Sequence, residues 1–379
     1  MLVSAPSMEK KKTPLWAAHK QLGARLIDFG GWDMPVQYPA GMIKEHRAVR
    51  EAVGLFDVSH MGEAYLRGPR VREVVERLCT NAVAAAPAGK AVYTLLCLPS
   101  GGVVDDCIFY KYSDEEFFVV VNASNTAKDV EWFHTQSHSQ CEVVDVSDAR
   151  SLIAVQGPKA VAMVDALAGG ALAGMPSFTF ADTTVAGVPC IAARTGYTGE
   201  DGFELCCANE DAVRLWDALL EAATPLGGLP IGLGARDSLR LESRLPLYGN
   251  DLDDEHTPLE AGLGWAVKLD GRDFIGADAL RRQKQAGLTC KLAGFRIDEA
   301  QRAIARHGYS IVDRGIADGS QVIGAVTSGG PGVHVGGAIG LAYVPIEKAA
   351  PGGTLTIDCR GKDVPAKVVE GKFYKRPAR

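Results

Sequence analysis

Tyr65-Leu66-Arg67-Gly68-Pro69-Arg70 is the stretch that organises the chain, because its pattern occurs twice. A strand-like run leads into a Gly-Pro pair and a basic residue, and an amphipathic helix pattern follows. The same order returns 89 positions later as Ile153-Ala-Val-Gln-Gly157-Pro158-Lys159. A repeat of this kind indicates two related units, each built of strands and helices.

Both copies continue with strand-like runs and a second helix, over 125–136 in the first and 210–223 in the second. Residues 103–112 and 117–122 predict a hairpin around the polar turn 113–116. The last hundred residues are short strands and turns after one short helix, which predicts a separate β domain. The fold class is therefore α+β, with two related units of mostly antiparallel strands and a C-terminal β domain.

Length and composition exclude several classes. A chain of 379 residues with 47% hydrophobic and 23% charged residues is typical of a multidomain globular protein. A net charge of −6 does not favour nucleic acid or an acidic membrane as partner, and no apolar run is long enough to span a bilayer. Nine scattered cysteines without a CxxC pair predict reduced thiols and no structural zinc. No targeting segment is evident at the start.

Two consecutive aspartates, Asp105 and Asp106, follow the glycine turn 101–102 inside a strand-like run. Aspartate is depleted in strand interiors, and at least one carboxylate of an adjacent pair must face apolar neighbours. Alternation predicts one face with Val104, Asp106, Ile108 and Tyr110, and another with Val103, Asp105, Cys107 and Phe109. A desolvated carboxylate is a candidate proton carrier. The alternative is a strand start whose aspartates face water or cap the turn.

Two further stretches carry polar groups that suggest a ligand site. Glu204 lies in a strand after the glycine-rich run Gly196-Tyr-Thr-Gly-Glu-Asp-Gly202, where the backbone can approach a flat molecule. Arg236 and Arg240 are one helical turn apart and share a face. The structural alternatives are a hairpin with a surface Glu and arginines paired with nearby acids. Asp57 and His60 are weaker candidates, because a turn with an Asp or Ser cap explains their segment better than a functional role does.

Six motifs in this order resemble the T-protein family of the glycine cleavage system, from about Thr13 to about Tyr374. They are Phe29-Gly-Gly-Trp-Asp-Met-Pro-Val-Gln-Tyr38, Leu55-Phe-Asp-Val-Ser-His-Met61, Gly101-Gly-Val-Val-Asp-Asp106, Gly196-Tyr-Thr-Gly-Glu-Asp-Gly202, Ala235-Arg-Asp-Ser-Leu-Arg-Leu-Glu242 and Leu247-Tyr-Gly-Asn-Asp251. The resemblance implies three lobes with folate in a central opening, the last lobe being a β-barrel-like or jelly-roll domain. The implied boundaries are 1–60 with 149–275 for the first lobe, 61–148 for the second and 276–379 for the third.

The resemblance also implies a reaction. The family takes the aminomethyl group carried on the lipoyl arm of H-protein, releases ammonia and forms methylene-tetrahydrofolate. A carboxylate can stabilise the cationic intermediate and orient or deprotonate a folate nitrogen. The matching residue is Asp106, and we expect Asp105 to face away and hold the turn.

The same match assigns the folate site. Glu204 suits the amino-amide edge of a pterin, with Arg236 as its charged partner or as a second ligand contact. The other positions that match folate-lining residues are Tyr197, Asn122, Met61 and Trp265, with Tyr93 as a further addition. We expect tetrahydrofolate as co-substrate, no metal, lipoylated H-protein as partner, and neither nucleic acid nor membrane.

The chain departs from the family at one place. After Val326-Thr-Ser-Gly329 it runs Gly330-Pro-Gly-Val-His334 in place of a serine-proline pattern, so no ligand residue is transferred from the last domain. The alternative function is a folate-binding accessory protein of the same fold without transferase activity, although such relatives tend to lose the aspartate pair. Folate-binding lobes of dimethylglycine- and sarcosine-oxidising flavoproteins also resemble the chain, but they carry a long flavin domain. The compartment would be the mitochondrial matrix in a eukaryote and the cytoplasm in a bacterium.

Overall fold

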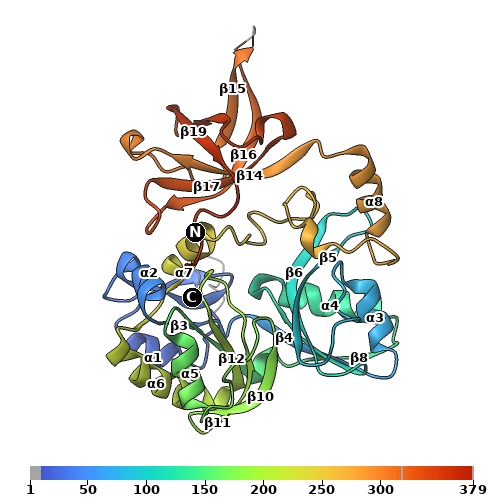
Figure 1. Cartoon of the computed structure of the whole chain (residues 1–379), viewed down its shortest axis with the longest axis vertical. Coiled ribbons are helices and arrows are strands. Elements are labelled where there is room, and N and C mark those ends of the chain that lie inside the picture. The colour runs from blue at the N-terminus through green and yellow to red at the C-terminus, as the bar shows by residue number, and fades with distance from the viewer. Residues whose placement is uncertain (1–9, 317–318, 378–379) are drawn as a thin grey trace, which may run out of the picture.

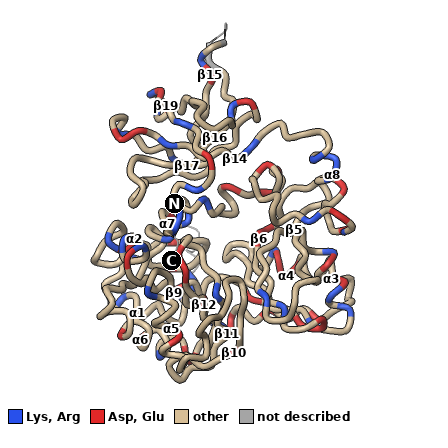
Figure 2. Tube along the Cα trace, in the orientation of Figure 1, with Lys and Arg blue, Asp and Glu red and all other residues tan. Residues whose placement is uncertain are grey.

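The computed structural model describes residues 10–316 and 319–377. Two bodies of strands and helices lie side by side, and the C-terminal strands form a third body above them (Figure 1). In the view of Figure 2, acidic and basic residues are interspersed over all three bodies. Among the described helices, none has the length and apolar character that crossing a membrane requires.

A five-stranded antiparallel sheet carries Asp106, with the strand order β5-β6-β7-β4-β8. The strands are β4 (Gly62–Arg67), β5 (Lys90–Cys97), β6 (Val103–Lys111), β7 (Glu116–Val121) and β8 (Glu142–Asp145). Helices α3 (Val71–Leu78) and α4 (Thr126–Ser137) pack on one face. The valines and leucine of α3 and Phe133 of α4 are buried there against Phe109. This burial follows from the apolar stripe of α3.

The second sheet has the order β10-β11-β12-β9-β3-β13. Its strands are β3 (Gly54–Asp57), β9 (Arg150–Gln156), β10 (Phe180–Val185), β11 (Val188–Ala193), β12 (Gly202–Ala208) and β13 (Leu229–Pro230). Helices α5 (Ala160–Leu167) and α6 (Ala212–Ala223) cover one face, where Trp216 is fully buried. Strand β13 runs parallel to β3, and the other pairs are antiparallel.

The predicted repeat is present in the two sheets. Strand β4 leads through Gly68-Pro69 into α3, and β9 leads through Gly157-Pro158 into α5. Gly68 and Gly157 have φ angles of 127° and 132°, a backbone conformation that favours glycine. A Cβ on Gly157 would also lie 2.5 Å from the carbonyl oxygen of Ala52. The glycines of the repeat are therefore required by the strand-to-helix turn.

The faces of the two sheets that helices α3 to α6 leave open pack against each other. Phe118 and Tyr110 from the first sheet share one buried cluster with Phe56, Ile191 and Cys206 from the second. Glu204 and Cys206 point to this interface because Phe203 and Leu205 face α6 on the other side of β12. Polar residues at the interface are desolvated from both sides.

The C-terminal strands close into a barrel with the order β14-β17-β16-β15-β18-β19. They are β14 (Cys290–Ile297), β15 (Ser310–Ile316), β16 (Gly319–Pro331), β17 (Ala338–Pro345), β18 (Thr354–Asp358) and β19 (Asp363–Val369). Phe295, Ile311, Ile357 and Val364 are among the residues that fill the barrel core. Closure leaves no free strand edge.

The remaining elements join the three bodies. The helices are α1 (Trp16–Gln21), α2 (Met42–Glu51), α7 (Leu233–Glu242) and α8 (Ala277–Ala286), and β1 (Arg25–Phe29) pairs with β2 (Trp32–Gln37). Short 3₁₀ helices are η1 (Ala123–Asn125), η2 (Ser147–Ala149), η3 (Asn209–Asp211), η4 (Thr224–Leu226), η5 (Gly264–Ala266), η6 (Glu299–Gln301) and η7 (Ile346–Lys348). Helix α7 contacts the barrel strands β16 and β17 as well as α2 and β2.

The predicted alternation along β6 is wrong at its first two residues. The register between β5 and β6 shifts, so that Leu96 pairs with Asp105 while Cys97 pairs with Val103, and Val104 is the extra residue of a β-bulge. As a result Val104 joins the helix-side core and Val103 packs elsewhere with Leu95. Beyond the bulge, the predicted alternation is present.

Candidate active site

Asp106 lies on β6 and faces away from α3 and α4. The hydroxyl of Tyr93 on β5 donates to its Oδ2 at 3.0 Å, and the side-chain amide of Asn122 donates to its Oδ1 at 2.9 Å. No described Lys, Arg or His forms an ion pair with Asp106, whose side chain is partly buried. Its carboxyl group is thus held by two neutral donors and has no cation to balance it.

This surrounding changes the acidity of Asp106. Burial is the main cause that raises its pKa, and the negative charge of Asp105 adds to the effect. The bonds from Tyr93 and Asn122 oppose the shift, and the resulting pKa is about 7. A carboxyl group with this pKa exists in both protonation states near neutral pH, which suits acid-base chemistry.

Asp105 has a different role from the one predicted. It faces away from Asp106 as expected, but it is fully buried and does not hold the glycine turn. Its Oδ1 accepts the side-chain amides of Asn122 and Asn125, both at 2.8 Å, and its Oδ2 accepts the backbone N–H of Asn122 at 3.2 Å. Asp105 therefore anchors η1, and Asn122 bridges the two aspartates.

The turn before β6 is set by backbone packing. Gly101 has a φ of 97°, and a Cβ on Gly102 would lie 1.8 Å from the carbonyl oxygen of Asp254. Only glycine fits at such a contact, so the turn needs no carboxylate cap.

Glu204 lies on β12 at the interface between the two sheets. The hydroxyl of Thr195 donates to its Oε2, and no described residue donates to Oε1. Burial raises the pKa of Glu204, while the Thr195 bond and the charge of Arg236 oppose the rise. Glu204 therefore presents one free carboxylate oxygen at a desolvated surface.

Arg236 on α7 does not pair directly with Glu204. Its guanidinium lies over the ring of Tyr197, 4.8 Å from the ring centroid, and forms no ion pair with the residues that the structure describes. The hydroxyl of Tyr197 donates to the carbonyl of Pro246. Of the two predicted roles for Arg236, the geometry leaves open the contact with a ligand.

Aromatic rings form the other side of the site. Tyr93, which donates to Asp106, stacks on Trp265 of η5 at 5.4 Å with an interplanar angle of 23°. Trp265 is 56% exposed, which is unusual for a Trp. Met61 packs at the edge of the interface between the sheets, and its side chain makes no hydrogen bond with the part of the chain that the structure describes.

The weaker candidates Asp57 and His60 have different surroundings in the structure. Asp57 accepts hydrogen bonds from Thr13, Ser59 and the ring of His19, so it is a structural anchor. His60 is buried, and burial followed by the charge of Arg236 lowers its pKa to about 4. A neutral histidine therefore lies beside the Arg236 side of the site.

Contacts from the barrel were missing from the sequence prediction. Arg240 on α7 binds Asp251 at 2.6 Å and the hydroxyl of Ser328 on β16 at 2.8 Å. Asp251 also accepts the hydroxyls of Thr327 and Ser328. The available signal was the motif Leu247-Tyr-Gly-Asn-Asp251, whose acid pairs with the second arginine of α7.

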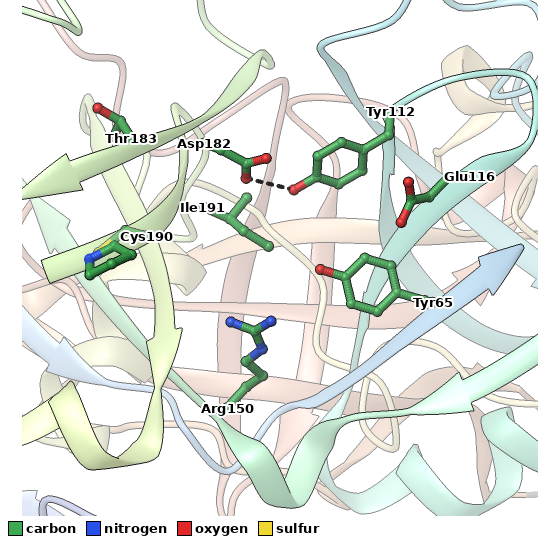
Figure 3. Close-up of a pocket in the computed structure, with 9 residues that line it drawn as sticks. Tyr65, Tyr112, Glu116, Arg150, Asp182, Thr183, Cys190 and Ile191 are labelled. Atoms are coloured by element: carbon green, nitrogen blue, oxygen red, sulfur yellow. Dashed lines mark hydrogen bonds between the residues drawn. The ribbon is translucent and has the colours of Figure 1, made fainter.

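Two cavities differ in their relation to this site. One of about 290 Å³ is bordered by Trp265 and Pro246, and its lining includes the cations Arg244, Lys291 and Lys372 but no acidic residue. The other, of about 380 Å³, lies around the opposite end of β6 and contains none of the predicted site residues (Figure 3). There Tyr112 donates to Asp182 at 2.8 Å, and Arg150 points into the space between the sheets (Figure 3).

Comparison with known proteins identifies the family of the chain. Residues 15–271 match the family described as the GCVT N-terminal domain, and residues 291–375 match the glycine cleavage T-protein C-terminal barrel domain. The aminomethyltransferase of Symbiobacterium thermophilum is 48% identical over 97% of this chain and 98% of its own length. That of Halothermothrix orenii is 46% identical over 96% and 99%.

A solved structure extends the agreement to three dimensions. The glycine cleavage system aminomethyltransferase T from Bartonella henselae superposes with a TM-score of 0.89 at 33% identity, covering 97% of this chain and 98% of that one. These relatives are bacterial, so they give no support to the mitochondrial alternative. The chain belongs to the glycine cleavage T-protein family.

Proposed function

We propose that this chain transfers the one-carbon unit of an aminomethyl group, carried on the lipoyl arm of H-protein, to tetrahydrofolate with release of ammonia. The observation that carries the proposal is Asp106, an under-compensated carboxyl group with a pKa of about 7 between Tyr93 and Asn122. Membership of the family supports the reaction class.

Asp106 acts on charge and protons in this proposal. The nitrogen of the aminomethyl group is protonated, so it leaves as neutral ammonia with the C–N bonding pair, and the methylene carbon bound to sulfur becomes cationic. The Asp106 carboxylate lowers the energy of that cation in a desolvated site. A folate nitrogen then bonds to the carbon, and Asp106 accepts the proton that this nitrogen loses. Attack by the second folate nitrogen expels the lipoyl thiolate, and the proton that this nitrogen loses converts the thiolate to the thiol.

The predicted folate residues divide by chemistry. The free oxygen of Glu204 would accept N–H groups from the amino-amide edge of the pterin, and Arg236 would bind a ligand acceptor from the adjacent helix. The rings of Tyr197, Trp265 and Tyr93, the amide of Asn122 and the thioether of Met61 would line the flat ring system.

The cationic cavity beside Trp265 suits the acidic end of the same substrate. Among the described residues, Arg244 donates only to backbone carbonyls, and neither Lys291 nor Lys372 has a carboxylate partner. Folate ends in a glutamate that carries carboxylates, and cations without acidic partners attract such a group. We place the tail of the substrate there.

A turnover assay tests the proposed function. Aminomethyl-loaded lipoyl H-protein is mixed with the chain in the presence and absence of tetrahydrofolate, and ammonia and methylene-tetrahydrofolate are measured. We expect fast ammonia release only with folate. Folate binding without turnover would instead identify the accessory protein of the same fold.

A further inference from the structure

Asp129 is a buried carboxyl group that the proposed reaction does not use. It lies in the first turn of α4 and is fully buried, and neither carboxyl oxygen accepts a hydrogen bond from any described donor. A buried ionised carboxylate without a donor is costly. A carboxylic acid that donates its own proton avoids this cost.

The group beside Asp129 is the carboxyl of Asp105. Asn125, the N-cap of α4 and four residues before Asp129, donates to Asp105 Oδ1 at 2.8 Å, so this end of the helix lies against Asp105. Burial is the main cause that raises the pKa of Asp129, and with a hydrogen bond to Asp105 and the charge of Asp105 it reaches about 10. Asp105 already accepts three N–H groups from Asn122 and Asn125, a set of donors that favours its ionised form. Of the two neighbouring carboxyl groups, Asp129 is therefore the one whose surroundings favour the protonated form.

The hydrogen bonds around Asp105 extend to Asp106, the proposed reactive carboxyl group. Asp105 lies between Asp129 and Asn122, and the amide of Asn122 donates to Asp105 and to Asp106. The charge of Asp105 is one of the causes that sets the acidity of Asp106. Whatever keeps Asp105 ionised therefore acts on Asp106.

We propose that Asp129 is a positioning residue of the transferase: it remains a neutral acid, donates its proton in a hydrogen bond to Asp105, and so keeps Asp105 ionised behind Asp106. This inference rests on the proposed function. No net proton transfer is involved, because the proton stays between the two carboxyl groups. The other ionisable groups that act here are Asp106 and Cys107 from β6 and Lys128 on α4.

The protonation state can be tested without any turnover. Infrared spectra of protein labelled with ¹³C at its aspartate carboxyl groups are recorded at pH 8.5, where Asp106 is mostly ionised. The aspartate label excludes the buried Glu63. We expect a protonated-carboxyl band in the native protein that disappears in Asp129→Asn, and a native spectrum without this band would overturn the proposal.

The kinetics of two Asp129 variants distinguish a protonated Asp129, which donates a hydrogen bond to Asp105, from an ionised Asp129. Asp129→Asn keeps an N–H donor toward Asp105, so we expect kcat within about threefold of native and an unchanged pH profile. Asp129→Leu removes the donor, and because Asp129 acts only through the charge of Asp105, kcat should fall by no more than it does in Asp105→Asn. Its acid limb should move to lower pH, because a less ionised Asp105 raises the pKa of Asp106 less.

Three outcomes contradict the proposal. If Asp129 is ionised, Asp129→Asn removes a negative charge and moves the acid limb by itself. If Asp129 only fills space, both variants lower the melting temperature but the folded enzyme keeps the native pH profile. If Asp129 contacts substrate, the KM for tetrahydrofolate rises together with the fall in kcat. The exposed Glu131→Gln on the same helix is the matched control and should change nothing.

Discussion

Two buried polar clusters in this protein compensate their charges in opposite ways. The Glu242 cluster consists of His46, Arg50, Glu200 and Glu242 under the barrel, and the Asp106 cluster consists of Asp105, Asp106 and Asp129 with Tyr93 and Asn122. In the first, Glu242 lies 3.1 Å from both Arg50 Nη2 and His46 Nε2 and accepts the backbone N–H of His334 at 2.7 Å. In the second, Asp105 and Asp106 accept from neutral donors, Asp129 accepts from no described donor, and none of the three acids forms an ion pair with a described cation.

The pKa shifts follow from this difference. Burial tends to raise the pKa of both carboxyl groups, but the contacts of Glu242 outweigh it and lower its pKa. For Asp106 the contacts are too weak, and its pKa rises to about 7. Burial alone does not identify a candidate reactive carboxylate; a partial set of compensating partners beside an open site is the additional sign. The following predictions test this distinction.

Asp106→Asn should have the largest effect. Without an ionisable carboxyl group there is neither a counter-charge nor a proton acceptor, so we expect aminomethyl transfer to fall about a thousandfold or more. Folate binding, measured by calorimetry, should change little because the amide has the same shape. Transfer that survives in this variant would remove Asp106 from the mechanism.

Glu242→Gln should act on stability. The change leaves Arg50 without one of its two acidic partners in a buried site, and we expect a loss of about 3–5 kcal/mol in the free energy of unfolding, measured with denaturant. The exposed pair of Arg70 and Glu73 gives the control, since Glu73→Gln should cost less than about 1 kcal/mol.

The pH dependence of the Glu242 effect has a defined sign. Because the folded-state pKa of Glu242 is lowered, its contribution is present above the ordinary value of 4.5 and disappears as the pH falls through the lowered value. The gap between native and Glu242→Gln proteins should therefore shrink in acid. A gap that grew in acid would contradict the compensated state of this cluster.

Glu204→Ala should weaken folate binding by about 1–3 kcal/mol, the range for a lost hydrogen-bonding partner in a buried site. We expect calorimetry to show the loss in Kd, with turnover at saturating folate affected less. An unchanged affinity would exclude Glu204 from the folate site.

Asp105→Asn should have the smallest effect on rate and a clear one on pH dependence. In the native enzyme kcat/KM should rise with pH through about 7 as Asp106 ionises. Removing the charge of Asp105 lowers the pKa of Asp106, so the acid limb should move down by about one unit. Asp114→Asn, exposed in the turn of the same hairpin, should leave the profile unchanged. An acid limb that stays at pH 7 in Asp105→Asn would show that Asp105 does not set the acidity.

Local patterns were sufficient for much of the fold. The Gly-Pro repeat, the hairpin of β6 and β7 and the C-terminal barrel strands depend on backbone geometry and on the period of apolar residues, both of which are local. The bulge at Val104 was not predicted, because it depends on the register with β5. The anchoring of η1 by Asp105 depends on Asn122 and Asn125, whose contact with β6 no spacing reveals.

The sequence by itself determined the two-unit repeat and the family, and it predicted Asp106 as the candidate reactive carboxylate. Only the tertiary structure decided how acidic that residue is, because its pKa depends on which groups surround it: Tyr93, Asn122, the charge of Asp105 and the absence of an ion-pair partner among the described residues. It also decided that Arg240 binds Asp251 and the barrel while Arg236 faces Tyr197. The type of each residue can be read from the sequence. Its desolvation and charge compensation depend on which distant segments the fold brings into contact.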